Sequence, residues 1–513
     1  MTDSRGLETD SNSLVVEVIR ETGPCANPLA DSGDPDEDGD GVKDDCDNCP
    51  TVSNRSQRNT SPVNVLEIGL GNACRELPRL WVSSDPADNS DFSTIQQAVD
   101  GAVDSPGAVS IEILPGTGPY FENVVLDRGR SFYFFGRRVG SVVPVIEYAG
   151  SGNGIFELRS AGEDPIVIQN LVLRGQGVTA GQRGVTSDPG ISTRLSDLRF
   201  EQLAYGLDLG DGEHRVQRIV ANETVGTGVS LNDGVLNLSY AELRGVSLGL
   251  RMIGPDARAG TDHLLFEGNG TGDAIVNDST LPGALALQHS TLVNWGTAVR
   301  GIPGNTTIAH SILWTNQLGI SGVPCLDIAW SDVQNIACGG TNLSIDPLFG
   351  DPAAGNYHLQ STSPLLDHGP DPSSFEGLPC TDLDGSLRLR DHQGQGLARV
   401  DPGAYERENT SIGPPEVSGL SWTGQATLVW NPVPAAVEYH VYRGILSTLA
   451  YSDFGTCGNT LDVIRTDTTL TDAGTPPPGD GFYYLITVGD DVGDESTLGV
   501  GTCAERSNFI ACP

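Results

Sequence analysis

The middle of the chain repeats one pattern, a polar or small residue followed by a short apolar run, as in Ser196-Asp-Leu-Arg-Phe, Gln217-Arg-Ile-Val, Ser239-Tyr-Ala-Glu-Leu and Asp262-His-Leu-Leu-Phe. Copies lie about 20–28 residues apart, the length of one coil of a β-solenoid, whereas a propeller blade needs about 40–50 residues. The spacing therefore predicts an all-β fold built on a parallel β-helix. The apolar anchors of the repeat are Val172, Leu198, Ile219, Ala241, Leu264, Leu292, Leu313 and Val333.

The two ends of this region carry further signatures. Residues 92–103 read as an amphipathic helix with Ile95, Ala98 and Val99 on one face, and a strand, Pro-Gly and Tyr-x-Glu follow. This order resembles the start of the pectin-lyase-like right-handed β-helix. The run Asp401-Pro-Gly-Ala-Tyr-Glu near the far end resembles the C-terminal part of bacterial exported β-helix proteins. The resemblance implies a right-handed β-helix over 79–406, with 92–103 as its cap, in a superfamily that holds lyases, esterases, hydrolases and non-catalytic proteins.

Composition limits the partners and the compartment. The 513 residues carry 67 Asp+Glu against 29 Lys+Arg, a formal net charge of −38, which disfavours nucleic acid and anionic membrane surfaces and favours calcium. No apolar run approaches the about 20 residues that cross a bilayer, so we expect no membrane insertion. Ten cysteines indicate disulfides and an oxidising compartment. We expect an extracellular or cell-surface protein, although the first residues lack the pattern of an export leader.

The acidic segment 1–78 contains a calcium loop at 34–59. Acidic residues at positions 1, 3, 5 and 12, with Gly41 at position 6, match a loop template that supplies the 6–8 oxygens calcium takes. The predicted ligands are the side chains of Asp36, Asp38, Asp40, Asp44 and Asp47 and the backbone carbonyl of Val42.

The same segment resembles a thrombospondin type 3 repeat, through Asp-x-Asp-Gly-Asp-Gly-Val-x-Asp-x-Cys-Asp-Asn-Cys-Pro followed by Asn54 and Gln57. That resemblance implies bound Ca2+ and a spacer role. Beyond a linker at 407–413, residues 414–513 alternate with a period of two and resemble a fibronectin type III β-sandwich.

The sequence offers three weak candidates for chemistry in the β-helix. Asp262 lies near an incomplete esterase motif but occupies the recurring polar position, so a structural role is more probable. The cluster Asp208, Asp211, Glu213, His214 and Arg215 reads as a solvated turn. The third candidate, Asp382, Asp384 and Asp391 beside Arg388 and Arg390, is either a cation site or an ion-paired loop closure.

Two further side-chain groups bear on ligand binding and stability. The set Trp295, Trp314 and Trp330 is either a sugar-stacking stripe or part of the core and turn packing, and we favour packing because aromatic stacks inside β-helices serve stability. Cys325 and Cys338 are close enough in sequence to staple one loop.

We therefore expect a non-catalytic binding or scaffold protein directed toward polysaccharide or the cell envelope. The catalytic residues of an enzyme are not identifiable from the sequence, and neither is the oligomeric state. The alternative is a polysaccharide lyase or other carbohydrate-active enzyme acting on acidic glycans such as pectin.

The calcium loop generates a direct test. Asp38→Ala removes one carboxylate ligand, so we expect the variant to lose the calcium-dependent protection of residues 25–74 against protease. The measurement compares digestion with calcium and with chelator in both proteins. Equal protection of the parent protein under both conditions contradicts the calcium assignment.

Overall fold

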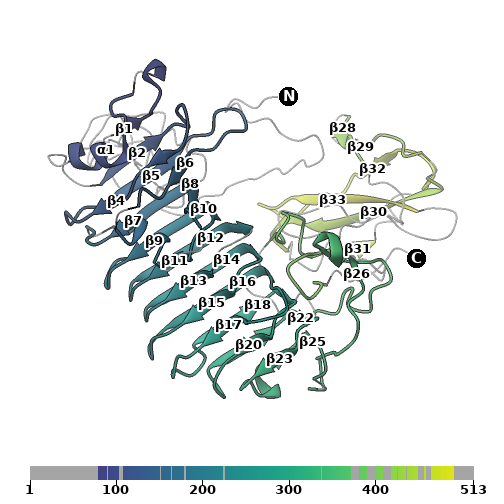
Figure 1. Cartoon of the computed structure of the whole chain (residues 1–513). Coiled ribbons are helices and arrows are strands. Elements are labelled where there is room, and N and C mark those ends of the chain that lie inside the picture. The colour runs from purple at the N-terminus through teal and green to yellow at the C-terminus, as the bar shows by residue number, and fades with distance from the viewer. Residues whose placement is uncertain are drawn as a thin grey trace. The chain divides into compact units, whose positions relative to one another are not determined.

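The computed structural model describes residues 79–88, 90–102, 108–150, 152–162, 164–177, 181–222, 226–336, 338–370, 380–389, 399–407, 417–423, 426–434, 436–448, 456–457 and 464–489. The predicted calcium loop at 34–59 lies outside these residues. The described fold is all-β, and its main part is a right-handed parallel β-helix of about nine turns (Figure 1). None of the described helices combines the length and the apolar character needed to span a membrane.

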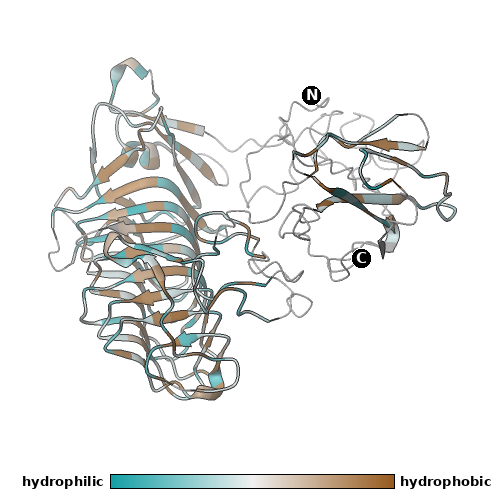
Figure 2. Ribbon diagram, turned by 90° about the vertical axis from the view of Figure 1, so that its right-hand side faces the viewer, coloured by the Kyte–Doolittle hydropathy of each residue, from teal (hydrophilic) through white to brown (hydrophobic). Residues whose placement is uncertain are grey.

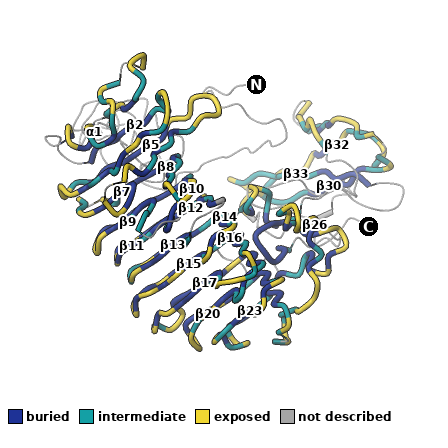
Figure 3. Tube along the Cα trace, in the orientation of Figure 1, coloured by how far each residue is buried: buried dark blue, intermediate teal, exposed yellow. Residues whose placement is uncertain are grey.

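Two parallel sheets form the walls of the β-helix. The larger contains β1 (Arg79–Val82), β2 (Val109–Ile113), β5 (Phe132–Gly136), β8 (Ile166–Arg174), β10 (Thr193–Glu201), β12 (Glu213–Asn222), β14 (Val235–Arg244), β16 (Arg258–Glu267), β18 (Leu285–Gln288), β21 (Thr306–Ala309) and β24 (Ile328–Ala329), and beside them β3 (Tyr120–Phe121), β6 (Val145–Glu147), β19 (Thr291–Val293), β22 (Ile312–Trp314) and β25 (Asp332–Val333). The smaller contains β4 (Val124–Leu126), β7 (Gly154–Leu158), β9 (Arg183–Ser187), β11 (Tyr205–Leu209), β13 (Thr227–Leu231), β15 (Leu248–Met252), β17 (Asp273–Asn277), β20 (Thr297–Arg300) and β23 (Leu318–Ser321). The strands are mostly buried and the connections between them exposed (Figure 3).

One corner of the β-helix has the same backbone conformation in eight successive coils. One residue of each coil there has a positive φ between 44° and 58°, which turns the chain between two strand segments. These left-handed corner residues are Asn170, Asp197, Arg218, Tyr240, His263, His289, His310 and Trp330. Only one of the eight is Asn, the type that tolerates this region most readily after Gly.

The residues after each corner alternate between fully buried and less buried positions in most coils. Hydrophobic residues are spread along the strands of the β-helix (Figure 2). The observed register corrects two of the sequence anchors, because Leu198 pairs with Leu171 rather than Val172, and Leu292 pairs with Phe266 rather than Leu264. Each coil has two inward positions after the corner, the first directly after it and the second two residues later. The repeat Asp262-His-Leu-Leu-Phe offers apolar residues at both, which explains the error.

Serines fill the first inward position in the last three coils. Ser290, Ser311 and Ser331 are fully buried, and each Oγ donates to the carbonyl oxygen two residues earlier. Ser311 Oγ also accepts from Ser290 N at 3.2 Å, and Ser331 Oγ accepts from Ser311 N at 3.2 Å. This ladder provides hydrogen-bond partners for the buried serine hydroxyl groups without placing a charge in the core.

The two ends of the β-helix are covered by short elements. The helix expected at 92–103 is α1 (Ile95–Gly101), with Thr94 as its N-cap and Ile95, Ala98 and Val99 buried. Buried Glu122 accepts from the backbone N–H groups of Ile95 and Gln96, both at 2.9 Å.

At the far end, β26 (Phe349–Asp351) and β27 (Asn356–Leu359) form a hairpin whose Phe349 and Leu359 pack on Leu265, Val293 and Ile312. The predicted staple is confirmed, since Cys325 and Cys338 form a disulfide.

The C-terminal region contains two three-stranded antiparallel sheets. They are β28 (Ser421–Trp422), β29 (Thr427–Val429) and β32 (Thr469–Thr471), and β30 (Glu438–Ile445), β31 (Thr456–Cys457) and β33 (Phe482–Gly489). Trp430 and Tyr439 lie in their shared core, with ring centroids 5.5 Å apart. This is the packing that the alternating pattern predicts.

Close packing inside the β-helix gives a stability test. A Cβ added at Gly249 comes within 2.4 Å of the Phe266 ring and 2.6 Å of the Ala274 carbonyl oxygen, whereas one at Gly118 meets nothing within 4 Å. We expect Gly249→Ala to lower the free energy of unfolding by about 1–3 kcal/mol through overpacking. Gly118→Ala serves as the control and should stay within about 0.5 kcal/mol in chemical denaturation. Equal effects of the two substitutions contradict this account of the core.

Candidate functional site

A groove opens on the outer face of the larger sheet, over β14, β16 and β18. Its volume is about 310 Å3. Gly260 and Ala286 occupy adjacent strands at the same register, and their short side chains leave this part of the face hollow. The groove is lined by Asn237, Leu238, Ser239, Gly260, Thr261, Asp262, Ala286 and Gln288. Amide, hydroxyl and carboxylate groups therefore surround a space the size of a small-ligand site.

Two arginines continue the floor of the groove along the β-helix. Arg194 on β10 pairs in register with Arg215 on β12, and Arg215 with Asn237 on β14. Strands lie about 4.8 Å apart, so the two guanidinium groups are close neighbours. Partial burial, together with the charge of Arg215, lowers the pKa of Arg194. Among the described residues neither arginine forms an ion pair with an acid.

A stack of aromatic rings lies at the left-handed corner beside the groove. The rings of Tyr240, His263, His289 and His310 follow one another with centroid distances of 5.0, 5.2 and 4.9 Å and interplanar angles of 5–17°. These distances match the strand spacing, because the identical corner conformation places each ring above the previous one. All three imidazoles are buried.

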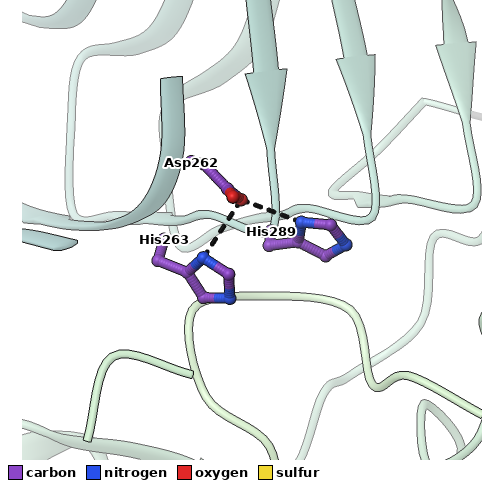
Figure 4. A group of neighbouring side chains, drawn as sticks. All are labelled: Asp262, His263 and His289. Carbon is purple, nitrogen blue, oxygen red and sulfur yellow. Dashed lines mark hydrogen bonds and ion pairs between the residues drawn. The ribbon is translucent and has the colours of Figure 1, made fainter. Parts of the chain in front are cut away.

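Asp262 connects the groove to this stack (Figure 4). His289 Nδ1 lies 2.8 Å from Asp262 Oδ1, and since an ionised carboxylate only accepts, Nδ1 carries the hydrogen. His263 Nδ1 lies 3.1 Å from the same oxygen, although its N–H is not aligned for a hydrogen bond. Burial by itself raises the pKa of Asp262, but the two imidazoles outweigh it and hold that pKa well below its usual range. The groove therefore keeps a fixed negative charge.

The histidines are neutral at physiological pH. Burial lowers the pKa of His289 to about 4 despite the attraction of Asp262. Burial, reinforced by His289 and Arg388, lowers the pKa of His310 to about 3. Burial lowers the pKa of His263 as well.

Asp262, His263 and His289 are donor types that bind transition metals, and their ligand atoms lie within 4.8 Å of one another. The two rings are nearly parallel, 17° apart, with centroids separated by 5.2 Å. An imidazole lone pair lies in the plane of its ring, so stacked rings do not direct their lone pairs to one ion. The geometry suits a carboxylate held by imidazole groups better than a metal centre.

The terminal part of the β-helix region covers the stack. Arg388 is fully buried; its guanidinium lies 3.4 Å from Glu406 Oε2 and also donates to the carbonyl oxygen of Gly403. Asp382 accepts from the N–H groups of Glu406 at 2.7 Å and Ser386 at 2.8 Å. Of the two interpretations of this cluster, the described residues show loop closure. Asp391 and Arg390 lie outside them.

The structure separates the other acidic candidate cluster. Asp208 Oδ2 accepts from Arg183 Nε at 2.6 Å, and Asp211 accepts from the N–H of Gly190. His214 is buried, with Nδ1 2.9 Å from Thr193 Oγ1 and Nε2 3.1 Å from the Gly210 carbonyl oxygen. Of this cluster, Glu213 and Arg215 lie two residues apart on the exposed face of β12, and Arg215 pairs in register with the groove residue Asn237.

The tryptophans do not form a stripe. Trp295 is fully buried and donates to the Phe266 carbonyl oxygen at 3.0 Å. Trp314 packs against the cluster around Leu265, and Trp330 contacts His368 edge-on at 5.9 Å. The structure therefore supports the packing interpretation of these tryptophans.

Sequence reasoning missed the histidine stack and the groove arginines. A signal exists in the sequence, because His263, His289 and His310 each stand three residues before an apolar residue of equivalent register, Phe266, Leu292 and Leu313. The anchor Leu264, taken in place of Phe266, conceals the first of these equal offsets. Asp262 directly precedes His263 in the sequence, whereas its hydrogen-bond partner His289 lies in the next coil, so the order of residues does not reveal the Asp262–His289 pair. The predicted calcium ligands Asp36 to Asp47 lie outside the described residues.

The role of Asp262 is testable by substitution. Asp262→Asn keeps the shape but removes the charge that the imidazoles stabilise, so we expect the free energy of unfolding to fall by about 1–3 kcal/mol at pH 7.5. Asp273→Asn is the matched control, because Asp273 has the same 23% side-chain exposure but pairs with exposed Arg300 at 3.0 Å. Such a surface pair contributes about 0–1 kcal/mol. Equal losses contradict a special role for Asp262.

Comparison with known proteins finds only distant similarity. No protein-family model and no curated protein matches this chain. Among solved structures, pectin methylesterase from carrot is similar at 14% identity, with a TM-score of 0.24, over 48% of this chain and 85% of that one. At that level the likeness carries no argument about activity.

Proposed function

We propose that this chain is an exported β-helix protein that binds polysaccharide along its groove and does not turn it over. The observation that carries the proposal is the groove itself, a hollow lined by amide, hydroxyl and carboxylate groups on a rigid sheet. Such groups exchange hydrogen bonds with water for hydrogen bonds with sugar hydroxyls at little reorganisation cost, because the strands fix their backbone.

The direction of the groove supports an extended ligand. The in-register row Arg194, Arg215, Asn237, Gly260 and Ala286 crosses five strands. Four steps at the usual strand spacing make about 19 Å, enough for several sugar rings. The two arginines at one end favour an acidic glycan, because a guanidinium binds a carboxylate through two parallel hydrogen bonds.

The acid–base properties of the groove favour binding over turnover. Glycoside hydrolysis generally uses a pair of carboxyl groups. Of the residues that line the groove, Asp262 alone is an acid, and its pKa well below the usual range makes it a poor proton donor or acceptor near neutral pH.

The other regions complete the proposal. We propose that the 34–59 loop binds Ca2+ as a thrombospondin type 3-like spacer and that residues 414–513 form a fibronectin type III-like module. Both proposed roles are compatible with a protein at the cell surface or outside the cell. The two antiparallel sheets with a common core around Trp430 support the second assignment.

The test uses the full chain, with calcium, in affinity electrophoresis against polyuronate, sulfated and neutral polysaccharide gels. We expect retardation in at least one acidic gel. The double variant Arg194→Gln/Arg215→Gln should bind the retarding polysaccharide with an affinity about tenfold lower, or weaker still, since one hydrogen bond to a charged group contributes about 1.5–3 kcal/mol.

Arg138→Gln/Arg251→Gln is the matched control, because both arginines are exposed and lie outside the groove. Reducing ends, released methanol and the ultraviolet absorbance of unsaturated sugars are followed in parallel. Accumulation of any product contradicts the non-catalytic assignment, and absence of retardation in every gel contradicts polysaccharide binding.

A further inference from the structure

We propose that the imidazole stack of His263, His289 and His310 is an acid-sensitive latch. At neutral pH it keeps the segments 380–389 and 399–407 packed against the β-helix, and in acid these segments dissociate from it. These two segments are called the closing segments below. The proposal concerns the closure of the β-helix and does not depend on what the groove binds.

The closing segments lie directly on the stack. Tyr240 Oη donates to the Thr381 carbonyl oxygen at 3.1 Å, and Gly403 N donates to the His310 carbonyl oxygen at 2.8 Å. Ala404 N donates to Thr291 Oγ1 at 2.9 Å. Both ends of the ring stack, Tyr240 and His310, are therefore bonded to the segments that cover it.

The charge placed over the stack makes its protonation unfavourable. The guanidinium of Arg388 acts on all three histidines, and His310 also faces His368. Asp262 is the negative charge that opposes this effect at the three rings. Imidazolium rings stacked about 5 Å apart repel one another as well as Arg388, in a site with little water.

Incomplete hydrogen bonding of two rings in the stack agrees with a metastable site. Within the described structure, Nε2 of His263 and Nε2 of His289 are buried without a hydrogen bond, and Nδ1 of His263 has only the misaligned 3.1 Å contact with Asp262 Oδ1. His214, the other buried histidine of the β-helix, has partners for both. A ring exposed by release gains water for these nitrogens and also gains a proton.

The sign of the pH effect follows from the closed state. In that state the stack histidines have pKa values below 6.5, with His289 at about 4 and His310 at about 3, so the released state binds more protons below pH 6.5. Two groups act the other way, because burial raises the pKa of Glu406 well above its ordinary value and also raises the pKa of Asp382. Acid therefore favours release because the three imidazoles that gain protons on release outnumber the two carboxyl groups that oppose it.

The test is hydrogen–deuterium exchange of the full chain between pH 7.5 and 4.8, corrected for the intrinsic exchange rate. We expect peptides of the closing segments to lose protection progressively as the pH falls below 6.5, while peptides of β8, β10 and β12 keep theirs. Unchanged protection of the closing segments down to pH 4.8 overturns the proposal.

The variant His289→Asn/His310→Asn removes two of the titrating rings. Asn is chosen because Asn170 occupies the same corner with φ 58°. With two carboxyls then opposing a single imidazole, the closing segments should stay protected in acid. His214→Asn is the control, and in this variant the closing segments should be released in acid as they are in the parent protein. Release of the double variant in acid to the same extent as the parent contradicts the latch.

A second measurement covers the case in which the double variant does not fold, as judged by circular dichroism. Hydrogen exchange at the imidazole C2 position in the parent protein reports the titration of each ring. The release midpoint must coincide with protonation of His263, His289 and His310. Release while these rings remain neutral overturns the proposal.

Discussion

Parallel pairing of each coil with the next is the constraint on which the other features depend. Apart from those at the ends of the sheets, the strands of the β-helix take their hydrogen-bond partners from the coil before and the coil after, so equivalent residues must share one backbone conformation. The left-handed corner shows how strict this is. Eight coils keep a positive φ there, although the residues that adopt it include Arg218, Tyr240 and Trp330, which gain nothing from that conformation on their own.

The same constraint places like side chains on top of one another. Stacked serines solve the problem by exchanging hydrogen bonds between coils, as Ser290 and Ser311 do. Stacked histidines solve it by remaining neutral, which is why the pKa of His289 is lowered to about 4. Stacked Arg194 and Arg215 cannot become neutral by losing a proton. They lie on the outer face, where water or a bound anion can offset the repulsion between the two guanidinium groups. The proposed ligand contacts and the proposed pH sensitivity thus have a common origin in the repeat.

Much of the fold was predictable from sequence because the repeat is a local signal. The spacing gave the number of residues per coil and the positions of most strands, and the amphipathic segment near Ile95 gave α1. Register was less predictable, since two inward positions per coil let Leu264 stand in for Phe266. The site was harder still. The groove exists because Gly260 and Ala286 are neighbours across a strand pair, and Asp262 is held by His289 from the next coil. Both facts depend on that same register.

The connections between strands have a different freedom from the strands themselves. The chain passes from β11 to β12 through residues 210–212, from β15 to β16 through 253–257, and from β17 to β18 through 278–284, yet the strands remain in register on both sides. Insertions and deletions are therefore absorbed at these connections, while a strand can be gained or lost only together with its whole coil. Evolution can lengthen such a rod in discrete steps, and it can decorate the rim of the groove with new loops without altering the floor.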